Sequence, residues 1–109
     1  MAKTISFTWN DKNYVLEFTR ASVIKMEKNG FKIQEASELP VSTIPDLFAG
    51  AFLARHPLVK QATIDEIYAQ MPDKTKLVEK LVEMYVDVIQ TLLDEPDDET
   101  KKISWEISE

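Results

Sequence analysis

Residues 73–93 read DKTKLVEKLVEMYVDVIQTLL and form the longest periodic stretch of the chain. At about 100° per residue, its apolar side chains fall on two adjacent rows of one helix. The rows are Leu77, Leu81, Met84, Val88 and Leu92, and Val78, Val82, Tyr85, Ile89 and Leu93. Together they cover roughly half of the circumference, which is wider than the apolar stripe of an ordinary surface helix. The stretch therefore predicts a central helix that needs neighbours on more than one side.

Two alternating stretches near the start of the chain predict a β-hairpin. Apolar and polar residues alternate over residues 5–9 and again over residues 14–18, as they do in half-buried strands. Residues 10–13, Asn-Asp-Lys-Asn, favour a turn because Asn and Asp tolerate positive φ. A two-stranded hairpin is not stable by itself, so its apolar face must be covered by helices.

Three shorter helices are predicted between the hairpin and the long helix. Ser and Thr are common at the N-cap position just before a helix, whereas Gly and Pro are common just after its last residue. The expected bounds are 20–29, 43–55 and 64–70, with Thr19, Ser42 or Thr43, and Thr63 as N-caps. Pro45 would lie in the first turn of the second helix, where a missing N–H costs little. Residues 34–41 are expected to form a loop, and Asp73 to cap the long helix.

The elements together predict an α+β fold that is mainly α. An N-terminal β-hairpin would pack on about four helices, with the long C-terminal helix central. Residues 1–93 would form one globular domain, and residues 94–109 an acidic linker with a C-terminal tail. In residues 94–99, five of six residues are acidic, which is typical of a solvated linker.

Beyond the acidic stretch, Ile103, Trp105 and Ile107 alternate with polar residues. Two interpretations of this pattern are open. In the first, the segment returns to the hairpin and adds a third, C-terminal strand. In the second, it docks on a partner, either by strand addition or with Trp105 as an aromatic anchor.

The composition disfavours several classes of function. The chain has no cysteine, only two glycines and a single histidine, His56. Thiolate zinc sites, cysteine nucleophiles and Gly-rich phosphate loops are therefore excluded. We expect no catalytic, cofactor or metal site, and no enzymatic activity. The net charge of −6 disfavours nucleic-acid binding, and no apolar run is long enough to span a membrane.

The order of elements resembles that of the tail assembly chaperones of long-tailed (siphophage-type) bacteriophages. The resemblance covers residues 5–93. It rests on the strand pair with its Asn-Asp-Lys-Asn turn, on residues 51–57 (AFLARHP), on the short helix that starts Thr63-Ile64-Asp65-Glu66-Ile67, and on the long helix. It implies a non-enzymatic protein of the host cytoplasm that binds the tape measure protein and helps recruit tail tube protein subunits.

For such a role the sequence offers several partner-binding residues. They are Phe31, Ile33, Ile103, Trp105 and Ile107, although Phe31 is also suited to filling the core. The spare apolar width of the long helix is a further candidate, and assembly into a homo-oligomer would suit an extended client. Two alternative functions stay open: an acidic inhibitor that mimics nucleic acid, and a structural component of the virion.

Overall fold

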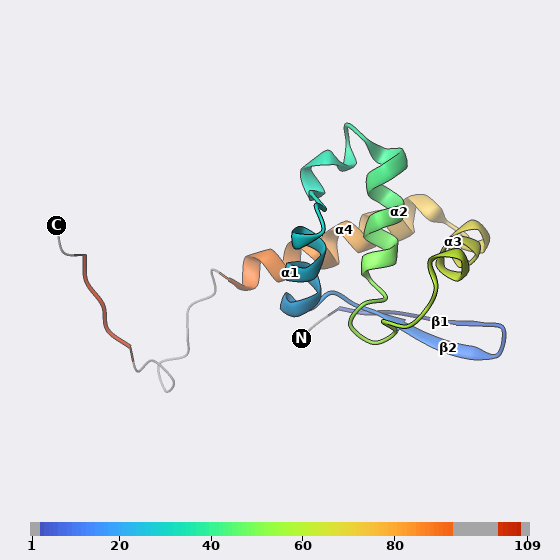
Figure 1. Ribbon diagram of the computed structural model, residues 1–109, viewed down its shortest axis with the longest axis horizontal. Helices are drawn as coiled ribbons and strands as arrows, with labels where there is room; N and C mark the ends of the chain where they lie inside the picture. The colour runs from blue at the N-terminus through green and yellow to red at the C-terminus, as the bar shows by residue number, and fades with distance from the viewer. Residues whose placement is uncertain (1–2, 93–102, 108–109) are drawn as a thin grey trace.

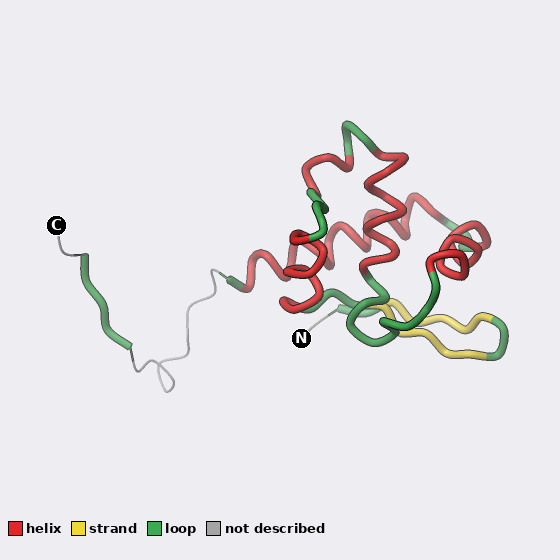
Figure 2. Tube along the Cα trace, viewed as in Figure 1, coloured by secondary structure: helices red, strands yellow, loops and turns green. Residues whose placement is uncertain are grey.

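A computed structural model describes residues 3–92 and 103–107 of the chain (Figures 1 and 2). The elements are β1 (Ile5–Trp9), β2 (Lys12–Leu16), α1 (Arg20–Lys28), the 3-10 helix η1 (Ile33–Ala36), α2 (Pro40–Gly50), α3 (Gln61–Gln70) and α4 (Lys74–Thr91). The expected class is confirmed: an N-terminal hairpin packs on four α-helices. In Figure 1, α4 runs behind α1 and α2, and both of these helices contact it.

The hairpin closes through a two-residue loop. Asn10 and Asp11 both have positive φ, 49° and 63°, which is the pattern of a type I′ turn. Lys12 and Asn13, which the sequence placed in the turn, instead belong to β2. The strands are antiparallel, and the register places Phe7 opposite Tyr14, with their rings stacked at 5.2 Å between centroids. The apolar face of the hairpin therefore points toward the helices.

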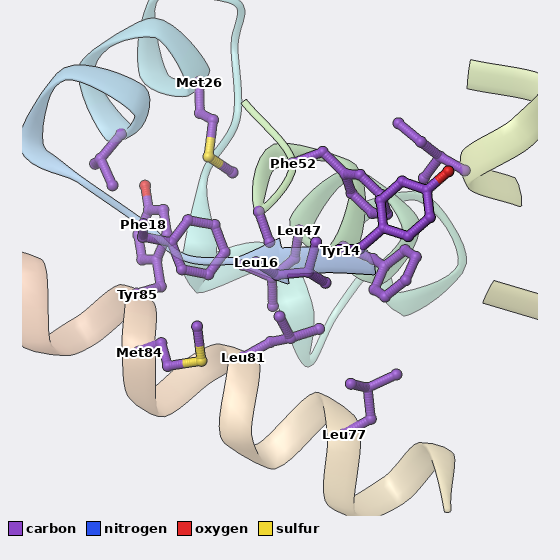
Figure 3. Packing of buried hydrophobic residues seen from close by; sticks show 14 of the residues in the cluster. Tyr14, Leu16, Phe18, Met26, Leu47, Phe52, Leu77, Leu81, Met84 and Tyr85 are labelled. Atoms are coloured by element: carbon purple, nitrogen blue, oxygen red, sulfur yellow. The ribbon is translucent and has the colours of Figure 1, made fainter. Parts of the chain in front are cut away.

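The core lies between β2, α2 and α4. Figure 3 shows the buried α4 side chains Leu77, Leu81, Met84 and Tyr85 pointing toward β2. Leu16 and Leu81 are both fully buried. The second apolar row of α4 is covered only in part, because Val82 is half-buried and Ile89 is exposed. The wide apolar arc is thus shared among several neighbours, as its width required.

Helix α1 has the termini that the sequence predicted. The Thr19 side chain accepts a hydrogen bond from the backbone N–H of Ser22, and the Ser22 hydroxyl accepts one from the backbone N–H of Thr19. Gly30 follows the helix with φ of 96°, a conformation that favours glycine. The helix also approaches α2 closely, because a Cβ on Gly50 would overlap the side chain of Met26.

The predicted bounds of α2 were wrong at both ends. The helix begins at Pro40, because the Thr43 N–H already donates to the carbonyl of Leu39, so Pro45 lies inside the helix. It ends at Gly50 instead of residue 55. The next carbonyl, that of Ala51, accepts a hydrogen bond from the Glu17 N–H of the hairpin, 3.1 Å away. A tertiary contact therefore takes the acceptor that a longer helix would have used.

Three further local predictions need correction. Residues 33–36 form η1, which extends into the stretch 34–41 that was expected to form a loop. Helix α3 starts at Gln61 rather than after Thr63, because the Ile64 N–H closes the first turn on Lys60. Asp73 precedes α4 as expected but has φ of 51° and makes no side-chain cap.

Candidate partner-binding surface

The 103–107 segment carries the most exposed apolar side chains of the sequence-predicted site. Ile103, Trp105 and Ile107 are 81%, 78% and 76% exposed. The segment forms no strand, and the described hairpin is a two-stranded sheet. Figure 1 shows it apart from β1 and β2. Among the described residues, the 103–107 segment therefore does not pair with its own hairpin as a third strand.

Phe31 and Ile33 lie at the margin of the core. The Phe31 ring meets the Tyr85 ring edge-on, with 5.3 Å between centroids. The backbone N–H of Phe31 donates to the carbonyl of Met26. Ile33 is half-buried against the same cluster. The structure therefore does not bring the five predicted residues together: three are exposed on one segment, and two are half-buried in the domain.

Phe31 also lines a groove that the sequence did not reveal. The groove has a volume of about 340 Å³. Its apolar lining comes from α1 and the loop after it, from α2, from the loop between α2 and α3, and from α3, and includes Met26, Phe31, Ala49, Leu53, Val59 and Ile64. Asn29, Asp46 and Gln61 add polar atoms. Because these residues come from four separate parts of the chain, only the packing of the helices brings them together.

Charge is divided unevenly along the chain. Residues 1–92 contain 11 Lys and Arg against 12 Asp and Glu, whereas residues 93–109 contain two against seven. The domain is therefore nearly neutral, and most of the net negative charge belongs to the sequence around the 103–107 segment.

One ion-pair cluster joins the start of the hairpin to α4. The Lys3 ammonium lies 2.6 Å from the Glu83 carboxylate and 3.0 Å from that of Asp87. Hydrogen bonds to Glu83 and then to Asp87 raise the pKa of Lys3, and the bond from Lys3 lowers the pKa of Glu83. All three groups face solvent, so salt screens this contact.

The outer edge of β2 is closed by the chain that follows α2. The N–H of Val15 donates to Nε2 of His56 at 3.0 Å, and the N–H of Glu17 donates to the carbonyl of Ala51. Arg55, next to His56, pairs with the buried carboxylate of Glu17. The single histidine is thus a hydrogen-bond acceptor for the hairpin. An imidazole accepts only in its neutral form.

Within residues 3–92 and 103–107, no three His, Asp or Glu side chains cluster in a way that could hold a metal ion. The helices in the same ranges are all too short or too polar to cross a membrane.

The chain belongs to the family described as Domain of unknown function (DUF5055), whose model matches residues 1–108. Comparison with curated proteins and with solved structures finds no match.

Proposed function

We propose that this chain is a tail assembly chaperone of long-tailed bacteriophages, which binds the tape measure protein and helps recruit tail tube subunits. The observation that carries the proposal is the exposure of Ile103, Trp105 and Ile107 on one short segment. Large apolar side chains gathered on a surface mark sites where another protein binds. A holding chaperone needs such a surface, because its client exposes apolar helices before assembly.

The charge distribution supports the same role. A segment with three exposed apolar side chains would itself promote aggregation. The seven acidic residues in 93–109 surround it with negative charge, which keeps copies of the chain apart. The same charge would attract a client with basic helices. Trp105 is the expected anchor, because Trp residues carry a large share of the binding energy at many interfaces.

The groove beside Phe31 is a second candidate contact for the client. Its volume lies at the lower end of the range for small-ligand pockets, so it suits one or two apolar side chains rather than a whole helix. Asp46 would favour a client residue with a positive charge nearby. We assign the groove a supporting role, because its apolar residues are already partly covered by the domain.

The nucleic-acid mimic receives less support. Such a protein needs carboxylates spaced like phosphates over one face, but residues 1–92 balance their carboxylates with nearly as many Lys and Arg. Ion pairs such as Lys3 with Glu83 interrupt the negative charge further. A structural virion protein is distinguished by its presence in purified particles, where an assembly chaperone would be absent.

Co-expression with the tape measure protein of the same genome tests the proposal. We expect the two proteins to co-purify, and a variant with Ile103→Ser, Trp105→Ser and Ile107→Ser to lose most of the association. A matched control carries Val41→Ser and Leu58→Ser, which remove exposed apolar side chains from the domain and should leave binding intact. No association of the unaltered chain, or equal losses in both variants, would refute the proposed role of this segment.

A further inference from the structure

We infer that the outer edge of β1 accepts the 103–107 segment of a second copy of this chain as an added strand. The inference concerns self-association and does not rest on the identity of any client. It follows from a difference between the two edges of the hairpin and from the pattern of the 103–107 segment.

The hydrogen bonds of β2 show that its edge is already occupied. In a hairpin with a two-residue loop, the residues that flank the loop form a hydrogen-bonded pair, and such pairs alternate along the strands. Trp9 and Lys12 are that pair here. The N–H groups of Val15 and Glu17 therefore point outward from β2, and they are satisfied by His56 and Ala51. No further strand can pair at these positions without displacing the chain after α2.

The edge of β1 is open by the same reasoning. Ser6 pairs with Val15 and Thr8 with Asn13, so the backbone groups of Ser6 and Thr8 point away from β2. Among the described residues, no hydrogen bond reaches these groups. β1 also lacks Pro and charged side chains, the residues that usually protect an edge strand from pairing with another chain.

The 103–107 segment matches this edge in length and pattern. It has five residues, Ile-Ser-Trp-Glu-Ile, and β1 has five, Ile-Ser-Phe-Thr-Trp. Alternate residues of a strand share a face, so a paired segment would place Ile103, Trp105 and Ile107 beside the half-buried apolar face of β1. Ser104 and Glu106 would then lie on the solvent-exposed face. Pairing would bury the three exposed side chains and satisfy the open backbone groups together.

A second copy is the occupant because the chain does not place the segment on its own hairpin. Residues 103–107 are outside any sheet, and their side chains are exposed. Each copy offers one open edge and one free segment, so reciprocal exchange between two copies closes a symmetric dimer.

Cysteine cross-linking between two different variants tests this arrangement. The chain has no cysteine, so a Thr8→Cys variant and a Ser104→Cys variant each carry a single thiol. Thr8 and Ser104 would lie on the same solvent-exposed face of the three-stranded sheet. On mixing and mild oxidation, mass spectrometry should show the mixed disulfide between the two variants. Leu58→Cys replaces Thr8→Cys as the control, because Leu58 is exposed in the loop that follows α2. This control should give much less of the mixed product.

Light scattering on the cysteine-free chain gives an independent measure. We expect a concentration-dependent dimer that Trp105→Ser weakens by roughly ten- to a hundredfold, the effect of losing one buried aromatic side chain. Thr8→Pro removes an N–H at the open edge only and should also abolish the dimer, while Asn13→Pro on β2 should not. If a proline variant fails to fold, the mixed disulfide still decides the matter.

Three results would overturn the inference. The first is a monomer at every concentration. The second is equal cross-linking of Ser104→Cys to Thr8→Cys and to Leu58→Cys. The third is a chain carrying both Thr8→Cys and Ser104→Cys that forms only an internal disulfide, which would mean that each segment pairs with its own hairpin. Thr8→Pro separates this inference from the proposed function, because it removes the accepting edge of the dimer but leaves Ile103, Trp105 and Ile107 available to the client.

Discussion

The backbone N–H of Val15 donates a hydrogen bond to Nε2 of His56, 3.0 Å away and 41 residues later in the chain. The imidazole ring also lies 5.1 Å from the ring of Tyr14, measured between centroids. One side chain thus supplies an acceptor to the edge of β2 and packs beside its apolar face. The hairpin is fixed to the chain after α2 by this contact and by the bond from Glu17 to Ala51.

His56→Ala should lower the free energy of unfolding by about 1–3 kcal/mol, because it leaves the Val15 N–H without its acceptor and removes the ring from Tyr14. Urea denaturation measures the change. His56→Gln should lose less, because its amide oxygen can accept the same bond. Leu58→Ala is the control and should change stability by less than about 0.5 kcal/mol, since Leu58 is exposed. Similar effects of His56→Ala and Leu58→Ala would contradict the edge-closing role.

Asp11→Gly should stabilise the protein by about 0.5–1 kcal/mol. Asp11 has φ of 63°, which an L side chain resists and glycine adopts freely, and Asn-Gly is a preferred type I′ pair. Thermal unfolding is the measurement. Glu66→Gly in α3 is a matched control that should destabilise by a similar amount, because glycine weakens a helix interior. A destabilising Asp11→Gly would show that the aspartate makes a contact that outweighs its backbone strain.

Leu81→Ala should cost about 2–5 kcal/mol, the usual range for removing a fully buried leucine side chain. Leu81 projects from α4 toward β2 (Figure 3), so the cavity would open between the hairpin and the long helix. Leu92→Ala is the comparison on the same helix face. Because Leu92 is 60% exposed, its loss should be under about 1 kcal/mol. Equal losses in the two variants would mean that α4 is not held by the face that the structure buries.

The raised pKa of Tyr85 leads us to expect that the protein loses stability in alkali. Burial raises the pKa of its hydroxyl, and the nearby charge of Glu27 raises it further. A group whose pKa is higher in the folded state stabilises the protein below its unfolded pKa, about 10 for tyrosine. That contribution is lost as the pH rises from there through the folded pKa.

Urea denaturation between about pH 9 and pH 11 tests this dependence on Tyr85. Tyr85→Phe should remove part of the alkaline loss, and Glu27→Gln a smaller part, since the Glu27 charge is the lesser cause. An alkaline profile of Tyr85→Phe identical to that of the unaltered chain would exclude Tyr85 as its origin.

Local features of the fold could be read from the residues themselves. The turn at Asn10 and the cap at Thr19 depend on side-chain chemistry that acts over a few residues. The buried face of α4 follows from helical periodicity, which a linear sequence displays directly. These predictions succeed because each depends on neighbours within one or two turns of the chain. The exposed side chains at 103–107 were binding candidates on pattern alone, and their role in binding stays a prediction.

The limits of α2 required tertiary information. Gly50 alone does not fix the end of the helix from the sequence, since an isolated glycine is tolerated within a helix and the next proline is Pro57. The helix ends there because Glu17, more than 30 residues earlier, donates to the carbonyl of Ala51. The groove beside Phe31 has the same origin, because its lining comes from helices that meet only in the folded chain.

The sequence by itself determined that this protein is an α+β domain with a hairpin and a long amphipathic helix, followed by an acidic stretch and three alternating apolar residues. Periodicity and turn chemistry are sufficient for that, because they act locally. Only the tertiary structure decided which edge of the hairpin is closed and which is open. That difference arises because His56 and Ala51, distant in sequence, reach the outward N–H groups of β2, and no described residue reaches those of β1.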